Sequence, residues 1–260
     1  MDEDPNNPVW SRYIGLLVDR EPTHCCLGDA SYGGLGAWSP ASDFNFMFRL
    51  TRDDLIRAGF DMKAINDDTC EPDGASDDGL HINVLEFVVI IIQLWFVLKF
   101  IQQSGPRLGG YIVTLIGDNT SALSWLRYAA RSHRPAVREL SRFALALTLA
   151  CSFDMKLSGR HLAGSLNTGA DALSRPQEFP MWDCAIKQHS PLAHCQAYRV
   201  PFELLSVLAE IISSAKTGVA YEPPTTELLT LALSTLSTGS GNSSSQSSLS
   251  RNSHRSKRSR

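Results

Sequence analysis

No excess of basic residues is present in this 260-residue sequence. Its 24 Lys and Arg residues stand against 27 Asp and Glu residues, which gives a formal net charge of -3 at pH 7. A protein that coats nucleic acid through bulk positive charge is therefore excluded, because binding to many phosphates requires a high density of Lys and Arg. Any contact with nucleic acid must come from a local patch.

Paired cysteines and a secretory leader are also lacking. The six cysteines have no regular spacing, and the first ten residues, MDEDPNNPVW, are acidic where a leader would be basic and then apolar. We therefore expect an intracellular protein with free thiols. A zinc site would have to use four scattered residues, namely Cys184, His189, His194 and Cys195. No Cys-x-x-Cys or His-x-x-x-His pair supports such a site.

The longest apolar stretch, residues 84–101, is interrupted by polar side chains. Glu86, Gln93 and Lys99 divide it, whereas a membrane-spanning helix needs about 20 predominantly apolar residues. We expect a buried helix here and no membrane partner.

Short apolar runs separated by turn-like breaks predict three antiparallel strands at 24–31, 34–40 and 44–50. A long helix should follow from residue 81, with Asn83 and Glu86 as its N-cap and N3 residues. The rest of the pattern alternates helices with two further strands. This order predicts an α/β fold with one mixed five-stranded sheet, three antiparallel strands first, flanked by helices.

Changes in composition divide the chain into segments. The segment 51–80 holds nine Asp or Glu residues with almost no apolar periodicity, so we expect a solvated insertion. The basic end, RNSHRSKRSR, has three readings that stay open: a nuclear localisation patch, a weak polyanion binder or no function. The predicted segments are a lead-in at 1–21, a catalytic domain at 22–177, a helical extension at 178–237 and a disordered Ser-rich tail at 238–260.

Four acidic residues stand where predicted strands end or predicted helices begin. They are Asp29 and Asp118 after the first and fourth strands, Glu86 in the first turn of the long helix, and Asp171 in the last helix. Each has a structural explanation as a cap, a turn former or a favourable charge at a helix start. If the first and fourth strands are neighbours, however, all four can face one another, and their joint placement favours a carboxylate cluster.

Clustered carboxylates repel one another unless cations neutralise them. Two Mg²⁺ or Mn²⁺ ions about 4 Å apart would do so, because hard cations prefer oxygen ligands. The same pair of ions stabilises an attacking water and a leaving oxygen. The chemistry predicted for this cluster is the hydrolysis of a phosphodiester.

Four ordered motifs resemble those of a known family. They are GDASYGGLGAW (28–38), HINVLEF (81–87), GDNTSALSWL (117–126) and GRHLAGSLNTGADALSRP (159–176). Over about residues 22–177 the chain resembles the ribonuclease H domain of retroelement reverse transcriptases. The last motif is similar to that of LTR retrotransposons and retroviruses, and the second and third are more similar to the DIRS-like, tyrosine-recombinase group. The resemblance implies a ribonuclease H-like fold and cleavage of the RNA strand of an RNA·DNA hybrid.

By resemblance, the four acids take the places of the family's metal-binding residues. His161 takes that of its mobile histidine, which is thought to assist proton transfer or product release. The acidic insertion departs from the compact members of the family. No polymerase signature, an aromatic residue, any residue and two aspartates, occurs in the sequence. The chain therefore resembles the ribonuclease H portion of a larger element product, or a remnant of one, with a polymerase or recombinase partner module on a separate or missing segment.

Contacts to the hybrid require donors for phosphates and 2′-hydroxyls. Arginines recur at spacings of three or four along 127–142 and could line one side of a helix pair, although a solvated face explains them nearly as well. Arg134 and Arg142 belong to this series. The candidate nucleic-acid-binding residues are Asn119, Ser121, Arg127, Arg131, Arg138 and Arg160.

Two other functions compete with this interpretation. A 3′→5′ exonuclease of the DEDD type shares the fold and the metals, but it carries Asp-x-Glu on its first strand, where this chain has Asp29-Ala30-Ser31. A degenerate domain that binds nucleic acid without cutting it stays open, although the presence of all four acids and His161 argues against lost activity.

Overall fold

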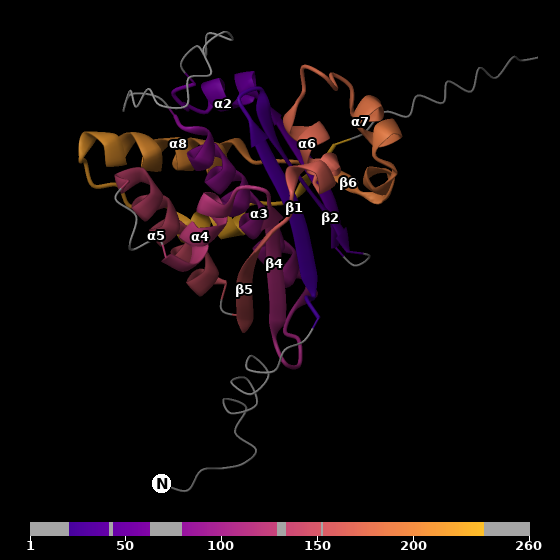
Figure 1. Ribbon diagram of the computed structural model, residues 1–260. Helices are drawn as coiled ribbons and strands as arrows, with labels where there is room; N and C mark the ends of the chain where they lie inside the picture. Colours follow the sequence, from indigo (N-terminus) through magenta and orange to yellow (C-terminus); the bar gives the residue numbers. More distant parts are fainter. Residues whose placement is uncertain (1–20, 42–43, 63–79, 129–133, 152, 237–260) are drawn as a thin grey trace, which may run out of the picture.

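The computed structural model describes residues 21–41, 44–62, 80–128, 134–151 and 153–236 (Figure 1). Its strands are β1 (His24–Ser31), β2 (Gly34–Ala41), β3 (Phe44–Thr51), β4 (Tyr111–Gly117), β5 (Met155–His161), β6 (Gln196–Arg199) and β7 (Ser234–Thr235). Its helices are α2 (Arg52–Arg57), α3 (Ile82–Ser104), α4 (Thr120–Tyr128), α5 (Pro135–Ala150), α6 (Thr168–Ser174), α7 (Trp182–Gln188), α8 (Phe202–Thr217) and α9 (Thr225–Thr230), with short 3₁₀ turns η2 (Gly164–Leu166) and η3 (Ser190–His194).

The strands form one mixed sheet in the order β5-β4-β1-β2-β3-β6-β7. Strands β1, β2 and β3 pair with one another in antiparallel directions, whereas β4 runs parallel to both β1 and β5, and β6 runs parallel to β3. Helices α4, α5 and α8 lie on one side of the sheet, and α6 and α7 lie on the other (Figure 1). The prediction of a mixed α/β fold flanked by helices is confirmed.

The predicted number of strands is wrong. The sheet has seven strands because the segment 178–237, expected to be purely helical, adds β6 beside β3 and β7 beside β6. These strands are only four and two residues long. Strands this short carry too few residues for apolar and polar positions to alternate visibly.

Helix α3 is the centre of the core. It is apolar on all sides, which is the composition of a helix covered from every direction. Three aromatic rings of β3, those of Phe44, Phe46 and Phe48, pack on its rings of Phe96 and Phe100. By length and composition α3 could cross a membrane, but 94% of its most apolar window is buried inside the protein, as in the core helix of a soluble protein.

The predicted cap of α3 is also wrong. His81 is the N-cap, and its Nδ1 accepts a hydrogen bond from the backbone N–H of Asn83 at 3.1 Å. The side chain of Glu86 instead accepts a hydrogen bond from the backbone N–H of Ala30 on β1, at 3.2 Å. Glu86 is therefore directed at the sheet and not at the end of its own helix.

The first part of the acidic segment 51–80 is not solvated as expected. Thr51 belongs to β3 and caps α2, which buries Leu55, while Phe60 and Met62 join the core after it. The apolar residues that pack here are isolated among many acidic ones, so they form no periodic pattern that would predict their burial. Residues 63–79 lie outside the described part of the chain.

The extension is packed on the catalytic domain predicted for 22–177. The indole N–H of Trp95 donates to the carbonyl of Leu228 at 3.0 Å, and the Lys99 ammonium donates to that of Leu229 at 2.6 Å. Both donors are on α3 and both acceptors on α9. Two polar groups of the central helix thus find their partners in the extension. The predicted tail at 238–260 and most of the lead-in at 1–21 lie outside the described residues.

Replacing Gly36 by alanine is expected to destabilise the protein by about 1–3 kcal/mol, because the added methyl group overpacks a close contact. A Cβ at Gly36 would lie 2.4 Å from Cβ of Leu173 and 2.7 Å from the backbone nitrogen of Ser174, on α6. Urea unfolding of the purified variant measures the loss. Gly105→Ala is a control in which the added Cβ meets no other atom. Any loss of stability in that variant comes from the positive φ of residue 105 and not from a close contact. An unchanged midpoint for Gly36→Ala would contradict the close approach of α6 to β2.

Candidate metal centre

Asp29 and Asp118 meet at the carboxyl ends of β1 and β4. The parallel register places Leu27 beside Ile116, so Asp29 and Asp118, two residues further along, come side by side. Asp29 is 6% exposed and Asp118 is partly buried. The predicted adjacency of these two acids is confirmed, and it follows from the neighbouring parallel strands.

Glu86 reaches the same place from the first turns of α3. Its carboxylate is 6% exposed, and ligand oxygens of Asp29, Glu86 and Asp118 all lie within 4.8 Å of one another. This is the one group of three or more acidic, His or Cys residues that could hold a metal ion within the described ranges. Hydrogen bonding to the backbone of β1 fixes the Glu86 carboxylate, so three carboxylates converge on one point.

The structure does not bring Asp171 into this group. Its carboxylate forms an ion pair with Arg175, one turn further along α6, with an N···O distance of 2.7 Å. It is close enough to the group to raise the pKa of Asp29. The expectation of four clustered acids thus holds for three of them, because a basic residue four positions away holds the fourth.

Sequence reasoning missed Ser174 as a member of the site. Its side chain is completely buried, and its hydroxyl donates to Oδ2 of Asp29 at 2.5 Å. Asp29 pairs with Gly36 across β1 and β2, so its side chain lies on the face of the sheet that α6 covers. The motif ADALSR contains Ser174, but nothing in one sequence shows which strand its hydroxyl would meet.

Burial and mutual repulsion raise the pKa values of the two most buried acids. Burial is the largest cause for Asp29, followed by the opposing hydrogen bond of Ser174 and the charges of Asp118 and Asp171, and the pKa is about 6. Burial and the charges of Asp29 and Asp118 raise the pKa of Glu86 to about 9. Near neutral pH Glu86 therefore retains its proton unless a cation replaces it.

The residues present fit a divalent cation. All the donors are carboxylate oxygens, which Mg²⁺ and Mn²⁺ prefer, and the protein supplies no basic side chain inside the three-residue group. Ser174 and the Ala30 N–H already fix the planes of two carboxylates. The buried group of Asp29, Glu86 and Asp118 could thus hold a metal ion.

Without divalent cations, the contribution of this site to the free energy of unfolding is expected to fall as the pH rises from about 4 to 9. The folded-state pKa values of Asp29 and Glu86, about 6 and 9, lie above their ordinary values of 3.8 and 4.5, so the folded state binds their protons more tightly. This contribution is complete below the unfolded pKa values and is lost as the pH passes through the folded ones.

The measurement is the Tm of wild type and Glu86→Gln in chelator and in excess Mg²⁺, at pH 5 and pH 8.5. Glu86→Gln should flatten the pH dependence in chelator, since glutamine does not titrate. The stabilisation by Mg²⁺ should be larger at the higher pH, because a cation binds the deprotonated carboxylates. Equal pH profiles for the two proteins in chelator would contradict the shifted pKa of Glu86.

His161 lies next to the acidic group. It is the exposed last residue of β5, where the register pairs it with Gly117, the residue before Asp118. The loop that follows approaches closely, because a Cβ on Gly164 would lie 2.9 Å from Oδ2 of Asp118. His161 therefore lies near the three acids but is not one of the residues that could hold the ion.

The predicted nucleic-acid-binding residues differ in their surroundings. Asn119 caps α4 by accepting from the Ala122 N–H at 3.1 Å, and its amide donates to Asn83 at 2.8 Å, so it already has structural partners. Ser121, three residues after Asp118 on α4, and Arg160, beside His161 on β5, are both exposed. Arg131 and the side chain of Arg127 lie outside what the structure describes. Binding of the hybrid by these residues stays a prediction.

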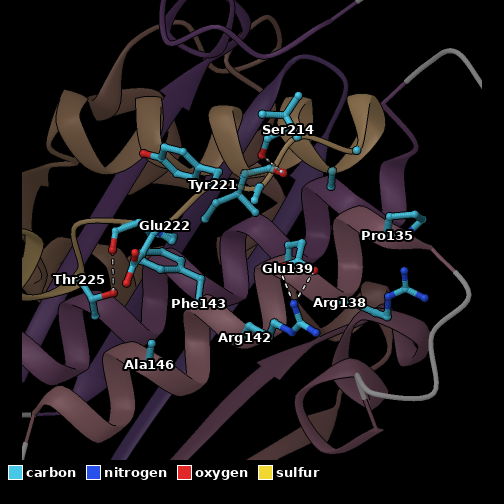
Figure 2. Close-up of a pocket in the computed structure, with 16 residues that line it drawn as sticks. Pro135, Arg138, Glu139, Arg142, Phe143, Ala146, Ser214, Tyr221, Glu222 and Thr225 are labelled. Carbon is cyan, nitrogen blue, oxygen red and sulfur yellow. Dashed lines mark hydrogen bonds and ion pairs between the residues drawn. The ribbon is translucent and has the colours of Figure 1, made fainter.

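Arg138 lies apart from the acidic group. Together with Arg142, which forms an ion pair with Glu139 at 2.9 Å, it lines a cavity of about 570 Å³ between α5 and the segment from α8 to α9 (Figure 2). Phe143 and Tyr221 also line this cavity (Figure 2). None of the four predicted metal-binding acids is among its lining residues.

A zinc site finds no support in the described ranges. The four residues considered for it do not form a group there, and the thiol of Cys195 donates to the carbonyl of Ser39 at 3.4 Å. The five cysteines in the described part of the chain are all free.

A comparison of the chain with protein-family models, with curated proteins and with solved structures found no match.

Proposed function

We propose that this chain hydrolyses the RNA strand of RNA·DNA hybrids with two Mg²⁺ ions, or Mn²⁺ in their place, in a ribonuclease H-like fold. The observation that carries the proposal is the convergence of Asp29, Glu86 and Asp118 within 4.8 Å at the ends of two parallel strands. The order and directions of β1 to β5 and the four resembling motifs support it.

In this proposal the three clustered acids hold the first ion, and Asp171 joins Asp29 to hold the second. When bound, the ions would lower the pKa of an attacking water and stabilise the leaving 3′-oxygen. The chain's own contribution is a rigid arrangement of oxygens that costs little reorganisation during the reaction. The products would carry a 5′-phosphate and a 3′-hydroxyl.

His161 would act at the entrance of the site. It is exposed and pairs with Gly117, the residue before Asp118, so in this proposal it would assist proton transfer or the release of the 5′-phosphate product. Arg160, its neighbour, and Ser121 at the start of α4 are exposed donors that could meet a phosphate backbone.

One observation favours a second candidate function, in which the domain binds hybrids without cutting them. The ion pair with Arg175 occupies Asp171, so a chain in which this pair persists would lack its fourth acid. Such a domain would act only as a nucleic-acid-binding module or only together with a polymerase or recombinase partner.

Cleavage of a labelled RNA·DNA hybrid by the full chain tests the proposal. Wild type is assayed with Mg²⁺, with Mn²⁺ and with chelator, beside double-stranded DNA and double-stranded RNA of the same sequence. Metal-dependent cutting of the hybrid alone supports the nuclease. Tight hybrid binding by folded protein with no cutting in either metal would instead favour the binding module.

A further inference from the structure

Helix α6 is joined to β1 by hydrogen bonds at both of its ends. At the start, the Asn167 amide donates to the carbonyl of Gly28 at 2.9 Å, and Asn167 is 1% exposed. At the end, the Ser174 hydroxyl donates to the Asp29 carboxylate, and the Ser31 hydroxyl donates to the backbone carbonyl of Ser174 at 2.6 Å. These bonds span the residues on either side of Asp29.

The bond from Ser174 differs from the other two in its acceptor. A serine in a helix usually donates to a backbone carbonyl three or four residues earlier, and the Asp171 carbonyl is available at 2.9 Å. The Asp29 oxygen is nearer, at 2.5 Å, and its charge makes it the stronger acceptor. The single hydroxyl proton is therefore directed at the carboxylate.

Fixing a carboxylate in this way has a consequence for a cation. A free Asp side chain rotates about its last bond, and a cation that binds it must arrest that rotation. The Ser174 bond arrests it beforehand and occupies one lone pair of Oδ2, which leaves the other oxygen and the remaining lone pairs for ligation. The hydrogen bond from the Ala30 N–H restricts the Glu86 carboxylate in the same way.

We propose that Ser174 is a positioning residue of the metal centre, whose hydroxyl holds the Asp29 carboxylate in the orientation that a divalent cation requires. The inference rests on the metal-binding part of the proposed function and not on the cleavage step. Ser174 is not a ligand in this proposal, because it is completely buried and its hydroxyl is directed at Asp29. Loss of such a supporting bond weakens metal binding by about 10-fold or more.

The test measures Mn²⁺ binding by the full chain without nucleic acid, from the decrease in the electron paramagnetic resonance signal of free Mn²⁺. Ser174→Ala is expected to weaken binding about 10-fold. Ser31→Ala is the matched control, because it also removes a serine hydroxyl bond between β1 and α6 but leaves the carboxylate bond in place. It should bind Mn²⁺ like wild type.

A second pair of variants separates the hydroxyl from the packing. Ser174→Thr and Ser174→Val have nearly the same shape and differ in the hydroxyl, so the threonine variant should bind Mn²⁺ more tightly than the valine variant. This pair replaces Ser174→Ala if that protein does not fold, as judged by its thermal unfolding transition.

Three results would overturn the inference: Mn²⁺ binding by folded Ser174→Ala equal to wild type, an equal loss in Ser31→Ala, or no binding by wild type. Hybrid cleavage is scored separately. A wild type that binds Mn²⁺, with the expected loss in Ser174→Ala, but cuts no hybrid would uphold the positioning role and refute the nuclease.

Discussion

Replacing Asp118 by asparagine should lower hybrid cleavage by about 10³-fold or more, which corresponds to several kcal/mol of lost transition-state stabilisation. Asparagine keeps the shape of the side chain but removes the charge that a divalent cation needs. Asp118 belongs to the three-carboxylate group, and its charge raises the pKa values of Asp29 and Glu86. The same substitution should therefore stabilise the metal-free protein, because it removes repulsion in a buried site.

The two effects are measured on one preparation. Cleavage is followed with a labelled hybrid in Mg²⁺, and the Tm is followed in chelator. Asp53→Asn, at an exposed position on α2, removes one negative charge far along the chain from this group and should change neither quantity. An Asp118→Asn protein that cuts at the wild-type rate would remove Asp118 from the catalytic site. A lower Tm in chelator would show that its charge does not strain the fold.

A chain that ends at residue 177 is expected to lose its cooperative unfolding transition. Eight Leu, Ile and Val side chains of α8 and α9 are buried. At about 1.5–3 kcal/mol each, their burial is comparable to or larger than the roughly 5–15 kcal/mol by which whole domains are stable. The truncation would also leave the Lys99 ammonium and the Trp95 indole without the carbonyls of α9.

Thermal unfolding followed by circular dichroism compares this truncation with a chain that ends at residue 236. The longer chain retains every described residue and should unfold like the full protein. The boundary at 177 stays a prediction that the experiment tests. A shorter chain with the wild-type Tm would establish residues 22–177 as an independent domain and would make the extension an appendage.

The sequence was most informative where a pattern is local and repeated. The apolar runs of β1, β2 and β3 and the long run of α3 predicted those elements closely, because alternation and helical periodicity arise from burial on one or all sides. The capping role given to Asn83 and Glu86 failed because His81, one residue before the helix, provides the cap. Strands β6 and β7 are defined by their neighbours in the sheet, which no local pattern reveals.

The candidate site was predictable to the extent that topology decides it. Adjacent parallel strands bring Asp29 and Asp118 together once β1 and β4 are neighbours, and the start of α3 brings Glu86. The place of Asp171 depended on a competing partner, Arg175, four residues away. The spacing of Asp171 and Arg175 was visible in the sequence. Whether Asp171 pairs with Arg175 or joins the other acids depends on its distance from those acids, which the sequence does not show. Ser174 required the packing of α6 on the sheet.

The pairing of β6 with β3 bears on how the chain avoids aggregation while it folds. The β3 sequence FNFMFRLT combines three phenylalanines with little charge, which is the composition of segments that assemble between molecules. In the folded protein β6 pairs beside Phe46 and Met47, so part of this strand is protected. Its partner is about 150 residues further along the chain, a separation long enough to delay pairing. During synthesis β3 is therefore made long before β6 can cover it, and in that interval it depends on chaperones or on rapid packing against α3.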